Sequence, residues 1–205
     1  MGLRLAFLYF WTPSYVIRRE LRNLSDQTNA ALCSLLATYA PKQQIPQNDP
    51  LLTSKGVKAR RAAMAQMHAQ MVDALASSIG RDRAVSLGRE ALFAVGVDLG
   101  RQTRRKLGVG ENPNDLIKAS KILYRILGIG FHIEWQDQAN AVAVIERCAL
   151  TEQYSKLTCE VLSATDEGVI AGLQPNVTMK FTQYITGGCQ NCKANLEFKT
   201  KETHP

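Results

Sequence analysis

Four of the five cysteines lie in the last third of the chain, at Cys148, Cys159, Cys189 and Cys192, while Cys33 lies apart among leucines. Thiolates are soft ligands that suit zinc and the iron of iron–sulfur clusters. The last two cysteines are two residues apart and follow a glycine pair, a turn that a tetrahedral site can use. The sequence therefore suggests a metal site at Cys148, Cys159, Cys189 and Cys192. Reversible thiol chemistry and ordinary buried cysteines without a cofactor stay open as alternatives.

A catalytic set would join one thiol to an imidazole and a carboxylate. The candidates are Cys159, His132 and Asp166, in which an activated cysteine or a metal-bound water would attack a polarised carbon. Asp166 is followed by Glu167, and such a pair on a helix is typical of an exposed face. Single histidines such as His68 are more often structural. The fold must therefore bring the three candidates together if they act as one site.

Length and composition place the chain among ordinary globular proteins. It has 205 residues, of which 45% are hydrophobic and 21% charged. This is enough for a sizeable core that needs no disulfide bonds or metal ions for stability. The net charge of +7 is uneven, because residues 1–108 carry 16 Lys and Arg against 7 Asp and Glu. A solvated helical surface explains this excess most simply. Nucleic-acid binding is not expected, because no aromatic residues are interleaved with the basic clusters.

The most apolar stretch is Leu5–Trp11, which is far shorter than the roughly 20 residues of a membrane-spanning helix. It also lacks the features of a secretory signal, so we expect a cytoplasmic protein. Its simplest role is a first element packed on the core or on a partner subunit. We expect a homodimer through the N-terminal helices, with another protein as a further candidate partner. Contact with a membrane surface beside Arg18, Arg19 and Arg22 is the other interpretation.

Apolar spacing and turn residues predict the elements in order. The segment Pro41–Pro50 holds three prolines and predicts a linker. We therefore expect residues 1–50 to form a helical arm that ends in this linker, and residues 51–205 to form a single α+β ligand-binding domain. Within that domain helices are expected over 54–128, and a sheet with one helix over 130–200. The individual helices are predicted over 14–40 with a break near Ser25-Asp26, 54–79, 82–107, 113–127 and 149–174, and the strands over 131–135, 141–148, 177–185 and 194–199.

The fold class that follows is α+β, with a helical N-terminal half packed on a small antiparallel sheet of β-β-α-β-β order. Gly96 and Gly100 are four residues apart and allow another backbone to come close. The methionines at intervals of three and four are typical of core packing, but thioethers also line apolar pockets. A pocket between helices and sheet is expected to be lined by Met64, Met67, Met71, Phe93, Phe131 and Trp135.

Several C-terminal residues resemble those of known families. One pattern consists of Cys159 near a helix start, Glu167-Gly168 and Gly172 on that helix, and Gly188-x-x-x-Cys192 before a last strand. It resembles the pattern of the bacteriochlorophyll 4-vinyl reductase domain family of small-molecule-binding modules. That pattern carries a further cysteine where this chain has Tyr184. The basic helical half, with Pro175, Phe181, Gly188 and Cys192, is similar to the L-2-amino-thiazoline-4-carboxylate hydrolase family. The resemblance covers roughly residues 60–200.

These observations lead to two functional hypotheses. The first is a domain that binds or senses a small apolar ligand, with a cysteine metal site as a possible addition. The second, which the hydrolase resemblance implies, is an enzyme that opens a cyclic amide or thiazoline. Heat stabilisation by apolar compounds without turnover distinguishes the first from the second.

Overall fold

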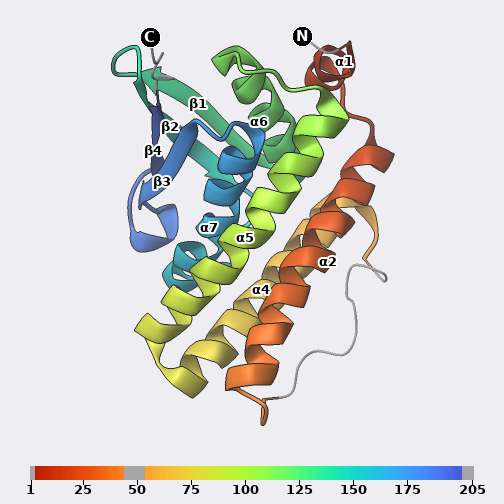
Figure 1. The fold of residues 1–205 in the computed structure, drawn as a ribbon. Helices are drawn as coiled ribbons and strands as arrows, with labels where there is room; N and C mark the ends of the chain where they lie inside the picture. The colour runs from red at the N-terminus through yellow and green to blue at the C-terminus, as the bar shows by residue number, and fades with distance from the viewer. Residues whose placement is uncertain (1–2, 44–53, 200–205) are drawn as a thin grey trace.

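The computed structural model describes residues 3–43 and 54–199, and it shows long helices packed against a small sheet (Figure 1). The α+β class and the β-β-α-β-β order of the C-terminal half are confirmed. The helices are α1 (Leu3–Phe10), α2 (Ser14–Tyr39), α4 (Gly56–Ile79), α5 (Arg81–Leu107), α6 (Pro113–Leu127), α7 (Lys156–Leu173) and the short 3-10 helix η1 (Ile185–Gly187). The strands are β1 (Ile129–Trp135), β2 (Asn140–Cys148), β3 (Val177–Gln183) and β4 (Cys192–Phe198).

The sheet is antiparallel throughout, with strand order β1-β2-β4-β3. Because β2 pairs with β1 on one side and with β4 on the other, its middle residues are buried. In Figure 1, α2, α4 and α5 lie side by side, and α7 lies between α5 and the sheet. One face of the sheet is therefore available to form a pocket with the helices.

Local signals account for the helix ends next to the site. The Asn112 side chain accepts a hydrogen bond from the Asn114 amide at the start of α6, where Pro113 takes the first helical position. Gly128 ends α6 with a φ of 75°. Ser155 caps α7 by accepting from the Thr158 amide, so that helix begins later than the predicted residue 149.

Helix α2 is continuous, and the predicted break near Ser25-Asp26 is wrong. Ser25 is buried, and the Thr28 hydroxyl donates back to the backbone carbonyl of Leu24 at 2.9 Å. Polar residues that favour turns are thus held in the helix by tertiary packing and by hydrogen bonds within the turn. The Leu32 side chain of α2 joins the core formed with α4 and α5. The linker prediction falls mostly on residues 44–50, which lie outside the described residues.

Helices α5 and α7 touch through glycines. A Cβ atom added at Gly96 or Gly100 would overlap backbone carbonyl oxygens of α7, and one added at Gly168 or Gly172 would overlap those of α5. The close approach predicted from Gly96 and Gly100 is therefore confirmed, and its partner is α7.

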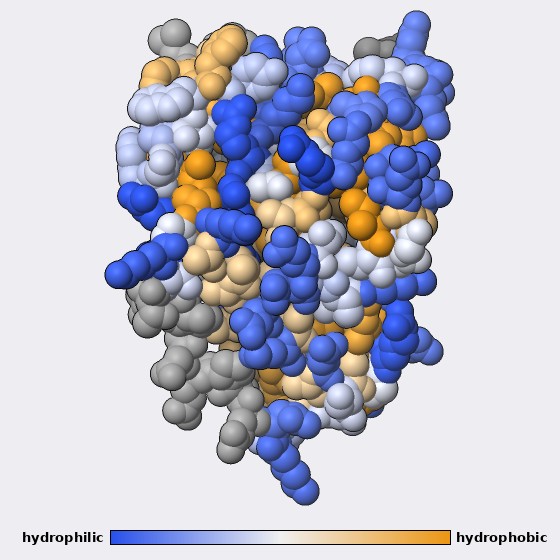
Figure 2. Space-filling model, turned by 180° about the vertical axis from the view of Figure 1, so that it is seen from behind, coloured by the Kyte–Doolittle hydropathy of each residue, from blue (hydrophilic) through white to orange (hydrophobic). Residues whose placement is uncertain are grey.

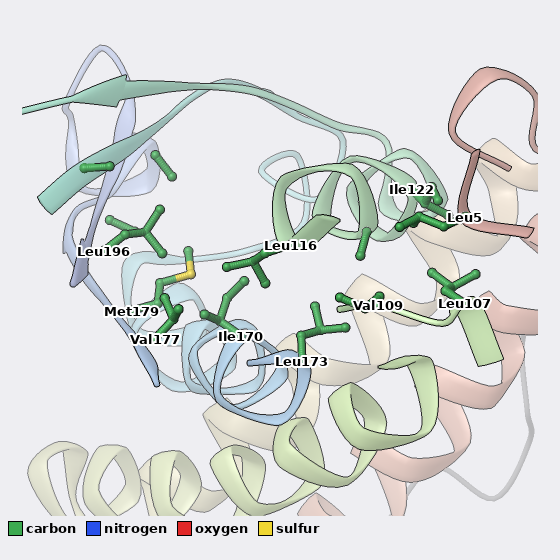
Figure 3. Close-up of a cluster of buried hydrophobic side chains, with 14 residues drawn as sticks. Leu5, Leu107, Val109, Leu116, Ile122, Ile170, Leu173, Val177, Met179 and Leu196 are labelled. Carbon is green, nitrogen blue, oxygen red and sulfur yellow. The ribbon is translucent and has the colours of Figure 1, made fainter. Parts of the chain in front are cut away.

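The N-terminal helix α1 packs on the core through one face. Leu5 is fully buried in a cluster that contains Leu107 and Ile122, and Figure 3 shows Leu5 beside Ile122. This confirms that the apolar N-terminal stretch begins as an element packed on the core. No helix in the described part of the chain is long and apolar enough to cross a membrane.

Candidate functional site

A cavity of about 170 Å³ lies where the helices meet the sheet. Its walls come from α2, α4, α5, α6, α7 and all four strands, and most of its lining side chains are apolar. In Figure 3, Leu116 of α6, Ile170 of α7 and Met179 and Leu196 of the sheet point toward one another across this region. The cavity is therefore suited to a mainly apolar guest.

Asp166 on α7 is the ionisable group that stands out in this lining. Protein surrounds it, yet it keeps some accessible surface, which faces the cavity. Burial, together with the smaller effect of the nearby Glu167 charge, raises the pKa of its carboxyl group to about 7. Within residues 3–43 and 54–199 no hydrogen bond or ion pair reaches this carboxyl group. It is thus an unpartnered polar group on an apolar wall.

Glu167 turns the other way, so the prediction of an exposed carboxylate pair at residues 166 and 167 is wrong. Its carboxylate accepts from Arg89 of α5 at 2.6 Å and from the Phe181 amide of β3 at 3.2 Å. Arg89 also donates to the Ser163 hydroxyl. Side chains at adjacent helix positions point about 100° apart. Glu167 can therefore bind Arg89 and β3 while Asp166 faces the cavity.

Three of the predicted metal ligands, Cys148, Cys159 and Cys192, line the cavity, whereas Cys189 is exposed and does not. Burial raises the pKa of Cys148 to about 12 and that of Cys159 to about 11, and it raises the pKa of Cys192 as well. The thiols are therefore protonated at neutral pH, which disfavours nucleophilic attack. Among the described residues no group of three or more His, Cys, Asp or Glu side chains is placed to hold a metal ion.

A buried polar network crosses one end of the cavity. His68 of α4 contacts the Thr28 hydroxyl of α2 through Nε2 at 2.8 Å and the Tyr154 hydroxyl through Nδ1 at 2.8 Å. Because Thr28 already donates to the Leu24 carbonyl, Nε2 carries the proton and Nδ1 accepts from Tyr154. Burial lowers the pKa of His68 to about 4, so the ring is neutral at neutral pH.

Other predicted site residues lie elsewhere. His132 is on the exposed face of β1, where its ring meets Glu134 at 3.1 Å and Glu146 at 3.2 Å, so it does not join Cys159 and Asp166. Successive residues of a strand point to opposite faces, and His132 has the opposite direction from Phe131, which lines the cavity.

The predicted apolar lining is divided in the same way. Met64 and Phe131 line the cavity. Met67 and Met71 pack in the core between α2, α4 and α5, because successive turns of α4 face different neighbours. Phe93 and Trp135 are 40% and 48% exposed and lie outside the lining. Trp135 packs instead on Phe198, with ring centroids 5.1 Å apart.

Sequence reasoning missed two tyrosines and undervalued one histidine. Tyr124 of α6 lines the cavity, and burial together with the charge of Asp166 raises its pKa. Tyr154 lies in the turn before α7, where no periodicity marks it. His68 carried a usable signal, because it shares the buried face of α4 with Met64 and Met71. A polar ring in such an apolar stripe needs buried partners.

The comparisons with known proteins agree with this architecture. Among solved structures, a trafficking protein particle complex subunit 3 from Naegleria fowleri, covalently bound to palmitic acid, has a TM-score of 0.55 at 12% identity, covering 70% of this chain and 97% of its own. The phenol-responsive sensory domain of the transcription activator PoxR, solved with phenol, has a TM-score of 0.50 at 14% identity, covering 67% of this chain and 73% of its own. At these identities the likeness shows the fold.

No curated protein matches the chain. The family model for L-2-amino-thiazoline-4-carboxylic acid hydrolase matches residues 60–196. The match runs from α4 into β4 and so includes α7 with Asp166 and the sheet as far as Leu196. With about two thirds of its length matched, the chain belongs to the L-2-amino-thiazoline-4-carboxylic acid hydrolase family.

Proposed function

We propose that the chain binds a small, mainly apolar molecule in the cavity, with the Asp166 carboxyl group as its polar anchor. The observation that carries the proposal is an unpartnered buried carboxyl group on a mainly apolar wall. Leaving such a group without a partner costs free energy, which a ligand with a hydrogen-bond donor recovers. The Thr165 hydroxyl, also buried at the lining and without a partner in the described residues, adds a second such group.

The size of the cavity limits the ligand. An apolar cavity of about 150 Å³ takes one benzene molecule, and this cavity measures about 170 Å³. A ligand with a single ring, or a short chain of similar volume, fits this space. The two structural neighbours support this class, since one is described with palmitic acid and the other with phenol.

Phenol and toluene are the matched probes, because they differ mainly in one hydroxyl group. We expect the wild-type protein to bind phenol at least about tenfold more tightly than toluene, since a hydrogen bond to a charged group contributes about 1.5–3 kcal/mol. The Asp166→Leu variant is expected to lose this preference and still bind toluene. Calorimetric titration gives both affinities, and the rise in unfolding temperature gives an independent measure.

Asp73→Asn is the control for this experiment, because Asp73 is an exposed residue of α4 outside the cavity. Its preference for phenol should equal that of the wild type. The proposal fails if neither probe binds the wild-type protein. It also fails if Asp166→Leu keeps the full preference for phenol.

Hydrolysis is the second candidate function, and the family match and the pKa of Asp166 favour it. A general base acts best with a pKa near the working pH, and Asp166 has a pKa of about 7. Water would add to the carbon of the ring C=N bond while the Asp166 carboxylate takes one of its protons and passes it to the ring nitrogen. The C–N bond would then break as the hydroxyl proton of the adduct moves to the same nitrogen, so that the carbon becomes a carbonyl and the nitrogen leaves as an amine. The protonated Cys159 thiol is less suited to act as a nucleophile.

The hydrolase hypothesis is tested with L-2-amino-thiazoline-4-carboxylic acid itself, by mass spectrometry for a product heavier by one water. If this function holds, Asp166→Asn is expected to lower turnover at least about 100-fold, because general-base catalysis contributes at this scale. Cys159→Ser is expected to retain most of the turnover. Equal losses in both variants would argue for a thiol nucleophile, and no product with the wild type would exclude this substrate.

A further inference from the structure

We propose that the exposed aromatic residues of α1 and the start of α2 dock on the surface of a membrane that contains anionic lipids. This interaction surface, the aromatic-basic face, comprises Phe7, Phe10, Trp11 and Tyr15 with Arg4, Arg18 and Arg19. It is independent of the ligand proposed for the cavity.

The aromatic part is unusually open to solvent. Phe10 is 82% exposed, Tyr15 64%, Trp11 62% and Phe7 57%. They are four of the six large hydrophobic residues exposed in the described part of the chain, and they are close together in sequence. Seen from behind, hydrophobic atoms gather at the end of the molecule where α1 lies, beside strongly hydrophilic ones (Figure 2).

The helix geometry explains why these side chains remain exposed. One face of α1 is used by Leu5, which is fully buried, so the opposite face points outward. Phe7 and Trp11 pack on each other with ring centroids 5.9 Å apart in an edge-to-face arrangement, and Phe10 packs on the half-buried Tyr9 at 5.4 Å. A monomeric protein rarely leaves such a patch uncovered, so a partner is expected.

The charge on the same face selects the partner. Residues 3–19 contain arginines at positions 4, 18 and 19. Arg19 pairs with the adjacent Glu20 at 2.6 Å, so the attraction to anionic lipid rests chiefly on Arg4 and Arg18. Tyr15, Arg18 and Arg19 are spaced three and four residues apart on α2, so they share one helix face. Aromatic rings settle at the boundary between headgroups and acyl chains, and arginines pair with anionic headgroups. With α1 only 8 residues long, the contact is one that lies on the surface.

A second copy of the chain is the competing occupant of this face. A two-fold interface brings identical patches together, so it would place the arginines of both copies against each other. An anionic bilayer has the complementary charge, and it accepts the rings without a matching pocket. The charge pattern therefore favours the lipid surface over a dimer.

The test uses the full chain and vesicles of phosphatidylcholine, with or without roughly one-third phosphatidylserine. We expect sedimentation with the anionic vesicles and weaker binding at high salt. Two double variants should each weaken partitioning onto the anionic vesicles at least about tenfold. One is Phe10→Ser with Trp11→Ser, and the other is Arg4→Gln with Arg18→Gln. Phe93→Ser is the matched control, because Phe93 is an exposed ring on α5 away from this face.

Tryptophan emission gives a second readout. The chain has two tryptophans, Trp11 and Trp135, so a Trp135→Phe variant reports on Trp11 alone. We expect its emission to shift to shorter wavelength with anionic vesicles. Absence of both the shift and sedimentation would overturn the proposal. Vesicle binding that is unchanged in the Phe10→Ser/Trp11→Ser variant would also overturn it. The same holds if the wild type binds no vesicles and light scattering shows a dimer that this variant dissociates.

Discussion

Replacing Gly96 or Gly168 by alanine is expected to destabilise the protein by more than about 3 kcal/mol, because the added methyl groups meet backbone atoms that cannot turn aside. A Cβ at Gly96 would overlap the Thr165 carbonyl oxygen, and a Cβ at Gly168 would overlap that of Phe93. In an ordinary helix the same change stabilises by about 1 kcal/mol. The sign of the effect in urea unfolding therefore reports the contact between α5 and α7 directly.

Two further glycines calibrate this result. A Cβ at Gly88 meets the Val161 Cγ1 atom at 2.7 Å, which is a side chain, so Gly88→Ala should cost less and should be rescued by Val161→Ala. Gly130→Ala in β1 should be close to neutral, because its nearest neighbour lies 3.6 Å away. If Gly96→Ala unfolds at the same urea concentration as Gly130→Ala, the helices are not held together by this contact.

Opposite effects of pH are expected for variants of Asp166 and His68. The Asp166 carboxyl group has a pKa of about 7 in the fold, raised by burial from 3.8. Between pH 3.8 and pH 7 the folded state holds the Asp166 proton more strongly than the unfolded state. The contribution of Asp166 to the free energy of unfolding is therefore lost as the pH rises through this range. At 1.36 kcal/mol per unit, the loss from pH 4 to pH 7 reaches about 4 kcal/mol.

His68 works in the other direction. Its pKa falls from 6.5 to about 4 on folding, so the unfolded state holds the proton more strongly in this window. Its contribution is present above pH 6.5 and is lost as the pH falls toward 4, by about 3 kcal/mol. In the wild-type protein the two contributions largely cancel between pH 4 and pH 6.5.

Single variants remove this cancellation. Asp166→Asn is expected to lose about 3 kcal/mol between pH 6.5 and pH 4, relative to the wild type, and to be the more stable protein at pH 8. His68→Gln is expected to gain stability relative to the wild type as the pH falls over the same range. Urea unfolding at several pH values measures both differences, and the other titrating groups cancel in the comparison. Parallel curves for the three proteins would show that neither group titrates abnormally.

The sequence predicted the elements well because each leaves a local signal. The stripe of apolar residues in α6, the cap at Asn112 and the stop at Gly128 are all readable in order along the chain. The break predicted in α2 failed because Ser25 is buried and Thr28 is held by a hydrogen bond with His68, which lies 40 positions away. Local propensity is overridden where such contacts form.

The cavity was only partly predictable. Asp166 and Cys159 were named from their residue types, and both do line it. Which of two adjacent carboxylates faces inward depends on the angle at which α7 packs on α5, and no spacing rule gives that angle. Met67 and Met71 failed as lining residues for the same reason, since a methionine stripe shows burial without showing which neighbour covers it.

The glycine contact between α5 and α7 also divides the walls of the cavity into a fixed part and an adaptable part. Asp166 is carried by a helix whose backbone rests against another backbone, so its position changes little with the guest. The opposite wall is built from α6 and β1, where Ile117, Leu123 and Phe131 are only half-buried. Redesign toward a ligand of different shape belongs on that wall, because its side chains can be exchanged while the anchor stays in place.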